Sequence, residues 1–219
     1  MARKQFDLIV FDWDGTLMDS TTAIVKCIQA AARDLGVPAP DRDMAAHVIG
    51  LGLQEALQKA VPGLDPEHYP RMVERYRYHY LSQDHELTLF EGTREMLQDL
   101  SQKGYFLAVA TGKSRVGLTR ALHAAGLMSF FDATRCADET FSKPHPAMLN
   151  ELTRELGQDM GRTVMIGDTT HDLQMAVNAG AAGIAVHYGA HPAHQLRALA
   201  PVYAAESVPE LHAWLAEHA

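Results

Sequence analysis

Cysteine and basic residues are scarce in this sequence. Only two cysteines, Cys27 and Cys136, occur among 219 residues. That is too few for a disulfide framework in a chain of this length, so we expect two reduced thiols. Lysine and arginine number 19 against 27 aspartates and glutamates, which gives a formal net charge of -8. An acidic surface repels nucleic-acid phosphates and anionic lipids, so the charge predicts no nucleic acid as a partner, although a small anionic substrate remains compatible with it.

Long apolar runs are missing as well. No stretch approaches the roughly 20 apolar residues of a membrane-spanning helix. The basic start is followed by a short apolar run that already contains Asp7, unlike the long apolar core of a signal peptide. We therefore expect a cytoplasmic protein with no membrane partner.

The composition nevertheless supports a packed core, because 47% of the residues are hydrophobic and 21% are charged. Nearly continuous apolar runs predict buried parallel strands. The strong runs are 6–11, 105–110 and 163–166, and weaker ones are 182–186 and 130–133. Helical periodicity separates these runs at 115–125, 146–156 and 172–179. This alternation is typical of an α/β fold with a doubly wound parallel sheet, a Rossmann-like core.

The alternation stops between about residues 19 and 90. That block contains no strong strand, and helical periodicity occurs at 20–35, 53–60 and 66–81. We expect residues 18–89 to form an inserted helical domain, and residues 1–17 and 90–219 to form the α/β core. The two connections between these domains would lie near Leu17 and Phe90.

Polar segments follow the first two strong strands, where ligands bind in sheets of this kind. Asp12-Trp13-Asp14-Gly15-Thr16 follows the first strand. Two carboxylates two positions apart can provide a nucleophile or metal ligand and a group that moves a proton. Thr111-Gly112-Lys113 follows the second strand, and a hydroxyl with backbone N–H groups at a helix start can hold an anion. Each segment also has a plain structural interpretation, a turn for the first and a helix cap for the second.

Two further segments complete the pattern. Lys143 precedes Pro144, which restricts the backbone and allows a helix to begin nearby. Gly167-Asp168 follows the third strand, and Asp172 comes four residues after Asp168, a spacing that suits a hard cation with oxygen ligands. Alone, a lysine is usually solvated, and acidic residues often complement a helix N-terminus. All four segments occur in order at strand ends, which favours a shared site.

In these four segments the chain resembles the haloacid dehalogenase superfamily of hydrolases, whose motifs run Asp-x-Asp-x-Thr, Thr/Ser, Lys and Gly-Asp-x-x-x-Asp. The resemblance covers nearly the whole chain and includes a helical cap inserted after the first motif. It implies that Asp12 is the nucleophile that forms an aspartyl-phosphate, with Asp14 as general acid and then general base. Thr111 would hold the phosphoryl oxygens, and Lys143 would neutralise charge on the nucleophile and the phosphate.

The same resemblance implies Mg²⁺ as the cofactor. Asp168 would ligate the ion together with Asp12 and the main-chain carbonyl of Asp14, and Asp172 would bind or orient the ligands around it. Because several aspartates would repel a phosphate dianion, Mg²⁺ and Lys143 must reverse the local charge before the substrate enters.

The acid at position 14 favours a phosphate ester, because an alkoxide leaving group needs a proton. The chain is therefore similar to phosphoglycolate-phosphatase-like enzymes, which implies a phosphatase acting on a small phosphorylated metabolite. A sugar-phosphate mutase of the same superfamily is an alternative, but those enzymes carry a histidine where we align Ile24. A phospho-receiver module or a non-enzymatic binding protein is another, but receiver modules have no place for the helical block.

Two loops remain to be assigned. His47, Gly50 and Gly52 lie before a predicted helix in the inserted block, and bare N–H groups there can bind an anionic substrate together with Thr111 and Gly112; a glycine helix cap is the alternative. Histidines occur at 187, 191 and 194, but their spacing fits no zinc pattern, so we expect a solvated surface.

Overall fold

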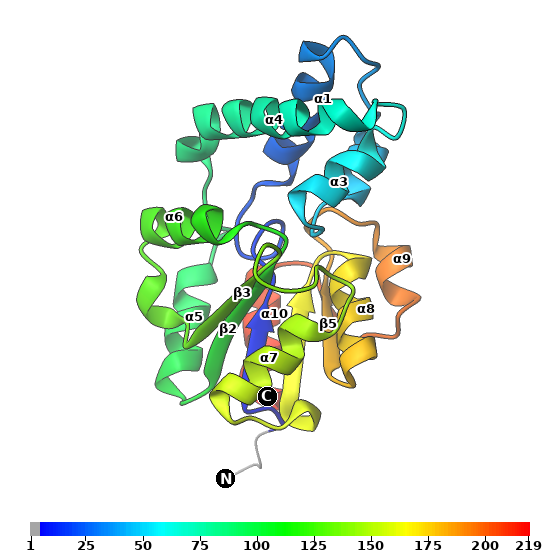
Figure 1. The fold of residues 1–219 in the computed structure, drawn as a ribbon. Helices are drawn as coiled ribbons and strands as arrows, with labels where there is room; N and C mark the ends of the chain where they lie inside the picture. The colour runs from blue at the N-terminus through cyan, green and yellow to red at the C-terminus, as the bar shows by residue number, and fades with distance from the viewer. Residues whose placement is uncertain (1–4) are drawn as a thin grey trace.

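The structure of the protein, a computed structural model, describes residues 5–219. The first four residues of the predicted core range 1–17 lie outside the described residues. Within the described range six parallel strands form one sheet in the order β3-β2-β1-β4-β5-β6 (Figure 1). The strands are β1 (Leu8–Phe11), β2 (Phe106–Thr111), β3 (Ala133–Cys136), β4 (Thr163–Gly167), β5 (Ala182–Val186) and β6 (Tyr203–Ala205). This order confirms the predicted α/β fold with a doubly wound parallel sheet.

Helices cover both faces of the sheet. On one face Ile9, Val109 and Ile166 belong to a buried apolar cluster with α5 (Thr93–Gln102), α6 (Arg115–Ala125) and α10 (Val208–His218). On the other face, Val10 and Met165 pack with α7 (Ala147–Leu156) and α8 (Thr170–Ala179), and the short helix α9 (Ala193–Arg197) packs at the β5 side. Because both faces are covered, β1 is apolar at every position and β2 and β4 are apolar apart from Thr111 and Thr163, which is why their runs are visible in the sequence.

A separate group of helices lies above the carboxyl ends of the strands (Figure 1). These helices are α1 (Thr21–Asp34), α2 (Arg42–His47), α3 (Leu53–Ala60) and α4 (Tyr69–Gln83), with 3₁₀ turns η1 (Pro66–His68) and η2 (Asp84–Glu86). Their buried apolar side chains, such as Ile28, Leu57 and Met72, form a cluster distinct from those of the sheet. The connecting segments run antiparallel, with Asp19 N donating to Thr88 O and Phe90 N donating to Leu17 O.

Several elements differ from the sequence prediction. The strand predicted at 130–133 is wrong: residues 128–130 form the 3₁₀ turn η3 (Met128–Phe130), and β3 begins at Ala133. The sequence signal fails because β3 is an edge strand whose middle residues, Thr134 and Arg135, are polar and half-buried. The short edge strand β6 and the helices α2, α5, α9 and α10 carry no prediction.

The two cysteines do not form a disulfide with each other. Cys27 and Cys136 are both buried free thiols, and burial raises their pKa values to about 11 and about 12. Among the described residues no helix is long and apolar enough to cross a membrane.

Candidate active site

The predicted catalytic residues converge because their strands are neighbours. β1 pairs with β2 on one side and with β4 on the other, all in parallel. Asp12 follows β1, Thr111 ends β2, and Asp168 follows β4, so the three residues emerge at the same edge of the sheet. Lys143 reaches this edge from the loop between β3 and α7.

Three aspartates form a buried cluster. One carboxylate oxygen each from Asp12, Asp168 and Asp172 lies within 4.8 Å of the others. None of the three residues is more than 1% exposed. Negative groups this close in a dry environment require positive compensation.

Lys143 supplies part of that compensation. Its Nζ lies 2.8 Å from Asp12 Oδ1 and donates a hydrogen bond of 2.6 Å to Asp172 Oδ1, with the side chain completely buried. Burial alone would lower the pKa of Lys143, but Asp12 and Asp172 raise it above its ordinary value, so the ammonium stays charged. One cation facing three carboxylates leaves the cluster with excess negative charge.

The cluster fits a divalent cation. Both Asp12 oxygens are buried, and neither accepts a well-directed hydrogen bond among the described residues. Burial raises the pKa of Asp12 well above its ordinary value, against the opposing effect of Lys143. Burial, and next the charge of Asp172, raises the pKa of Asp168 to about 7. An all-oxygen ligand set with an unsatisfied carboxylate is what Mg²⁺ binds in proteins.

The other two aspartates of the cluster are held in place by local bonds. Thr16 Oγ1 donates to Asp168 Oδ1 at 2.9 Å, and Ala190 N donates to Asp168 Oδ2 at 2.7 Å. Thr169 caps helix α8 in a capping box with Asp172, whose Oδ2 accepts from Thr169 N and Oγ1. This box begins α8 at Thr170, earlier than the predicted residue 172.

Glycines allow this close approach. A Cβ on Gly15 or Gly189 would overlap the side chain of Asp168, and a Cβ on Gly167 would overlap that of Asp172. The glycines of the first and last motifs therefore have a steric role as well as a conformational one.

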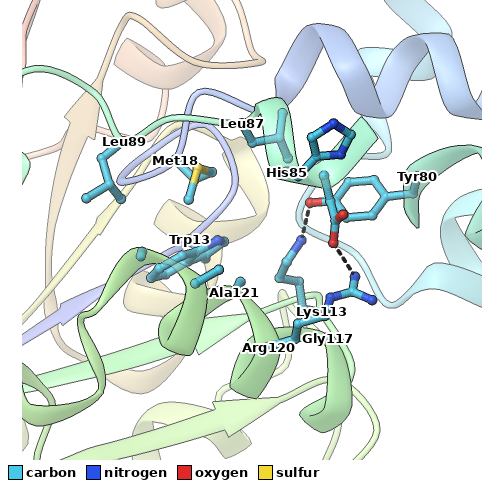
Figure 2. Close-up of a pocket in the computed structure, with 13 residues that line it drawn as sticks. Trp13, Met18, Tyr80, His85, Leu87, Leu89, Lys113, Gly117, Arg120 and Ala121 are labelled. Atoms are coloured by element: carbon cyan, nitrogen blue, oxygen red, sulfur yellow. Dashed lines mark hydrogen bonds and ion pairs between the residues drawn. The ribbon is translucent and has the colours of Figure 1, made fainter. Parts of the chain in front are cut away.

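Asp14 lies beside the cluster and faces the helical segment. Its Oδ1 accepts a hydrogen bond of 2.7 Å from Ser20, and both carboxylate oxygens lie 3.0 Å from Lys113 Nζ. Lys113 also bonds to the hydroxyl of Tyr80 on α4 at 2.9 Å (Figure 2). Burial alone would lower the pKa of Lys113, but Asp14 raises it above its ordinary value.

The sequence pattern predicts no role for Lys113, although this residue lies in the Thr111-Gly112-Lys113 segment. A lysine directly after Thr-Gly at a strand end could have been found as a partner for an acid on the next strand. The hydrogen bond between Lys113 and Tyr80 could not have been predicted, because no pattern in the sequence shows that α4 lies near the end of β2.

The predicted substrate-binding loop lies on the core. A Cβ on Gly112 would overlap the carbonyl oxygens of Gly50 and Leu51, and Gly52 N donates to Ser142 Oγ at 2.9 Å. Gly50 has a φ of 93° and Gly52 caps helix α3. Thr111 is buried, and its Oγ1 accepts from Lys113 N at 3.2 Å. The structure thus brings this loop to Gly112, next to Thr111, while substrate binding by His47, Gly50 and Gly52 stays a prediction.

His187, His191 and His194 differ in part from the solvated surface that the sequence predicts for them. His194 is exposed, but His191 is only 3% exposed, and the ring of His187 is buried against Glu206. His191 Nδ1 accepts from Thr170 N at 3.0 Å, and its Nε2 lies 3.1 Å from His47 O. Burial lowers the pKa of His191 to about 4, so the ring is neutral. The prediction of a solvated histidine surface is wrong here because this loop folds under the helical segment.

A doubly wound parallel sheet with paired acids, a hydroxyl and a buried lysine at its strand ends is typical of an enzyme of the α/β class. A family model described as haloacid dehalogenase-like hydrolase matches residues 9–186. The chain belongs to this hydrolase family.

Relatives agree with this assignment. The chain is 40% identical over 211 residues to "Probable phosphatase IndB" of Dickeya dadantii, covering 93% of this chain and 91% of that protein. It is 32% identical to a phosphoglycolate phosphatase of Aliivibrio fischeri, covering 85% of this chain and 86% of that protein. The crystal structure of a predicted phosphoglycolate phosphatase from Haemophilus somnus has a TM-score of 0.84 at 26% identity, covering 94% of this chain and 96% of that one. These similarities place the chain with the phosphatases of the family.

Proposed function

We propose that the protein is a Mg²⁺-dependent phosphatase that hydrolyses small organic phosphate monoesters through an aspartyl-phosphate on Asp12. The observation that carries the proposal is the buried Asp12 carboxylate. Its Oδ2 has no hydrogen-bond partner among the described residues, and its Oδ1 is paired only with the Lys143 ammonium at 2.8 Å, while Asp168 and Asp172 lie close by. A carboxylate that its own protein leaves unsatisfied is available for a cation and for attack on phosphorus.

Asp12, Asp168 and the main-chain carbonyl of Asp14 would hold the ion, and Asp172 would orient Lys143 and the start of α8. When bound, Mg²⁺ supplies charge neutralisation at the phosphoryl group and at the carboxylates. Asp172 is less available than the other two carboxylates because Lys143 and Thr169 already occupy both of its oxygens.

The reaction divides into two displacements at phosphorus. In the first, an Asp12 oxygen forms a bond to phosphorus as the bond to the alcohol oxygen breaks, and Asp14 gives that oxygen its proton. In the second, water attacks phosphorus, Asp14 takes a proton from the water, and inorganic phosphate leaves Asp12 free. Thr111 would bind the phosphoryl oxygens, and Lys143 would offset their charge.

We propose further that residues 18–89 form a cap over a core of residues 1–17 and 90–219, and that the protein is cytoplasmic. A loop with Gly50 in contact with Gly112 supports the cap role, because it covers the predicted phosphate cradle. Such a cover excludes bulk water from the acyl phosphate and limits substrates to small phosphorylated metabolites.

Release of inorganic phosphate from a panel of small phosphate esters tests the proposal. We expect multiple turnovers that stop on chelation and return with Mg²⁺. A single burst of stable Asp12 phosphorylation would instead indicate a receiver, and isomerised sugar phosphate without net release would indicate a mutase. Undiminished turnover in excess chelator would remove the metal from the proposal.

A further inference from the structure

Two histidines of the core share one carbonyl oxygen of the helical segment. His171 Nε2 lies 2.9 Å from His47 O, and His191 Nε2 lies 3.1 Å from the same oxygen. His171 is in the first turn of α8 and His191 follows β5, whereas His47 ends α2. Because a carbonyl oxygen only accepts, each ring donates its Nε2–H to it. We call this arrangement the histidine clasp.

The tautomer of His191 is fixed by its second contact. Its Nδ1 accepts a hydrogen bond of 3.0 Å from Thr170 N, and a backbone N–H only donates. Nδ1 therefore carries no proton, so the proton of the neutral ring lies on Nε2, toward His47 O. Since Thr170 and His191 both belong to the core, the core itself orients this donor toward the helical segment.

The end of α2 supplies the acceptor. The last carbonyl groups of a helix have no donor within the helix. The amides that follow do not reach His47 O, because Ile49 N donates to Ala46 O and Leu51 N donates to Val48 O. The two core histidines therefore supply donors that these neighbouring amides do not.

The three rings also pack on one another. The rings of His47 and His191 stack with centroids 4.8 Å apart and planes 14° from parallel. The ring of His171 lies edge-on to that of His191, with centroids 5.2 Å apart. His191 is only 3% exposed. This packing limits the access of water to the shared carbonyl, and a hydrogen bond in a drier environment is electrostatically stronger.

The clasp anchors one end of the loop 47–52, and a different core loop anchors the other end. Gly52 N donates to Ser142 Oγ at 2.9 Å, and Ser142 lies between β3 and α7. Between these anchors the carbonyl oxygen of Gly50 lies so close to the core that a Cβ on Gly112 would overlap it. The loop thus covers the predicted phosphate cradle while both of its ends are held.

We propose that His171 and His191 are positioning residues that hold the helical segment closed over the phosphoryl site through the carbonyl of His47. Opening of the segment breaks both hydrogen bonds, so the clasp sets the fraction of molecules in which the site meets bulk solvent. This role rests on the proposed function, in which Asp12 carries a phosphoryl group that the closed segment shields. Both histidines act through the loop and not on the reacting atoms.

Amide hydrogen exchange, followed by NMR in the full-length metal-free protein, tests the clasp without turnover. The Gly52 amide reports opening, because its acceptor Ser142 belongs to the core. The Ile49 amide is the internal reference, because its acceptor Ala46 belongs to the helical segment itself. Loss of one neutral hydrogen bond of the clasp should speed exchange at Gly52 by roughly threefold to tenfold and leave Ile49 unchanged.

The variants isolate the donors. His171→Leu removes one donor and places a better helix former in α8, whereas His171→Gln returns an N–H group. His191→Asn removes the other donor, and its side-chain carbonyl can still accept from Thr170 N. We expect faster Gly52 exchange in His171→Leu and His191→Asn, and exchange close to that of the wild type in His171→Gln. His194→Leu, which alters an exposed histidine of α9, is the matched control and should change nothing.

The exchange data can overturn the clasp in two ways. Unchanged exchange at Gly52 in both His171→Leu and His191→Asn would show that these donors do not hold the segment. A joint rise at Gly52 and Ile49 would show local unfolding of the helical segment instead of its separation from the core. If one of the two variants does not fold, the other decides.

The effect on the reaction is measured with para-nitrophenyl phosphate, Mg²⁺ and added ethylene glycol. Each nitrophenolate released counts one phosphoryl group placed on Asp12, and each inorganic phosphate counts one taken by water. The difference is transfer to the alcohol, whose oxygen bonds to phosphorus as the bond to Asp12 breaks, while Asp14 takes the alcohol proton. Because a closed segment excludes the bulkier alcohol, His171→Leu should raise the ratio of transfer to hydrolysis by the same roughly threefold to tenfold as Gly52 exchange.

The two measurements separate the two proposals. The transfer ratio does not depend on how much of each variant is folded, so a change in it reports shielding and not stability. Faster exchange at Gly52 with an unchanged ratio would overturn the shielding role and leave the phosphatase intact. Exchange that responds as expected, with no nitrophenolate from wild type or variants, would overturn the proposed function and leave the contact between His47 and the core in place.

Discussion

The two aspartates of the first motif, Asp12 and Asp14, each contact a lysine, and the two contacts differ in their surroundings. Lys143 contacts Asp12 inside the core with no exposed side-chain surface, and a second carboxylate, Asp172, fixes it from behind. Lys113 contacts Asp14 at the edge of a cavity, with both side chains about a tenth exposed, and its other partner is Tyr80 of the helical segment. The first contact belongs to the core alone, whereas the second joins the core to α4.

Under the proposed function, this difference gives the two contacts different tasks. A buried cation surrounded by fixed carboxylates can stabilise only the group that all substrates share, the phosphoryl group. A cation that faces a cavity and bonds to the helical segment can respond to the part that varies between substrates. The predictions below separate the two tasks, beginning with the largest effect.

Asp12→Asn should abolish turnover on every ester, by a factor on the order of 10⁴ or more, as for other nucleophile replacements. An amide is a poor nucleophile and a weak ligand for Mg²⁺. Steady-state phosphate release is the measurement, and Asp43→Asn, an exposed aspartate of α2, is the control. Retained activity above a hundredth of the wild type would exclude Asp12 as nucleophile.

Lys143→Met should lower kcat/KM on all esters by about 10² to 10³, the usual cost of a lost preorganised charge. It should also destabilise the metal-free fold by about 3 kcal/mol, because buried carboxylates lose their partner. Urea unfolding in chelator measures the second effect.

Lys113→Met should act differently, with a loss in kcat/KM that differs between esters of different alcohols. Comparing kcat/KM across a panel of esters for both lysine variants is the direct test. Equal losses on every ester for Lys113→Met would mean that the two contacts do the same task.

The buried cluster should also appear in the pH dependence of stability. The pKa of Asp168 is about 7 in the folded protein, above the ordinary carboxyl value, so the folded state binds more protons than the unfolded state between about pH 4 and 7. Stability of the metal-free protein should therefore fall as the pH rises through this window, by a few kcal/mol in order of magnitude.

Mg²⁺ should recover that loss, because it binds the deprotonated carboxylate. Asp168→Asn should flatten the slope and remove the Mg²⁺ effect. Denaturant midpoints at several pH values, with chelator and with Mg²⁺, provide the measurement. The same slope in Asp168→Asn would show that other groups dominate.

Tyr80→Phe should have the smallest effect, a loss of a few-fold in kcat/KM, consistent with one hydrogen bond of ordinary strength. The ring remains over the Lys113 ammonium, 4.6 Å from its centre, so only the hydroxyl bond is removed. Tyr78→Phe, an exposed tyrosine on the same helix, is the control. Identical kinetics for both variants would show that this bond does not couple α4 to the reaction.

The sequence predicts the centre of the molecule better than its edges. Strands β1, β2 and β4 are almost entirely apolar because helices cover both faces, and the polar residues at their carboxyl ends locate Asp12, Thr111 and Asp168. The edge strand β3 carries Thr134 and Arg135, so the apolar-run criterion selects the preceding aromatic residues instead. Contacts between distant elements, such as Tyr80 with Lys113 and His191 with His47, depend on tertiary packing that no local pattern encodes.

Gly112 carries a consequence for how this enzyme could diverge or be engineered. The carbonyl oxygens of Gly50 and Leu51 occupy the space that a side chain at position 112 would fill. A single methyl group at position 112 would act as a spacer between the two halves of the molecule, whereas a methyl at Gly63 would meet no atom within 4 Å. How closely the loop of Gly50 and Leu51 approaches the end of β2 is thus limited by one hydrogen atom at position 112.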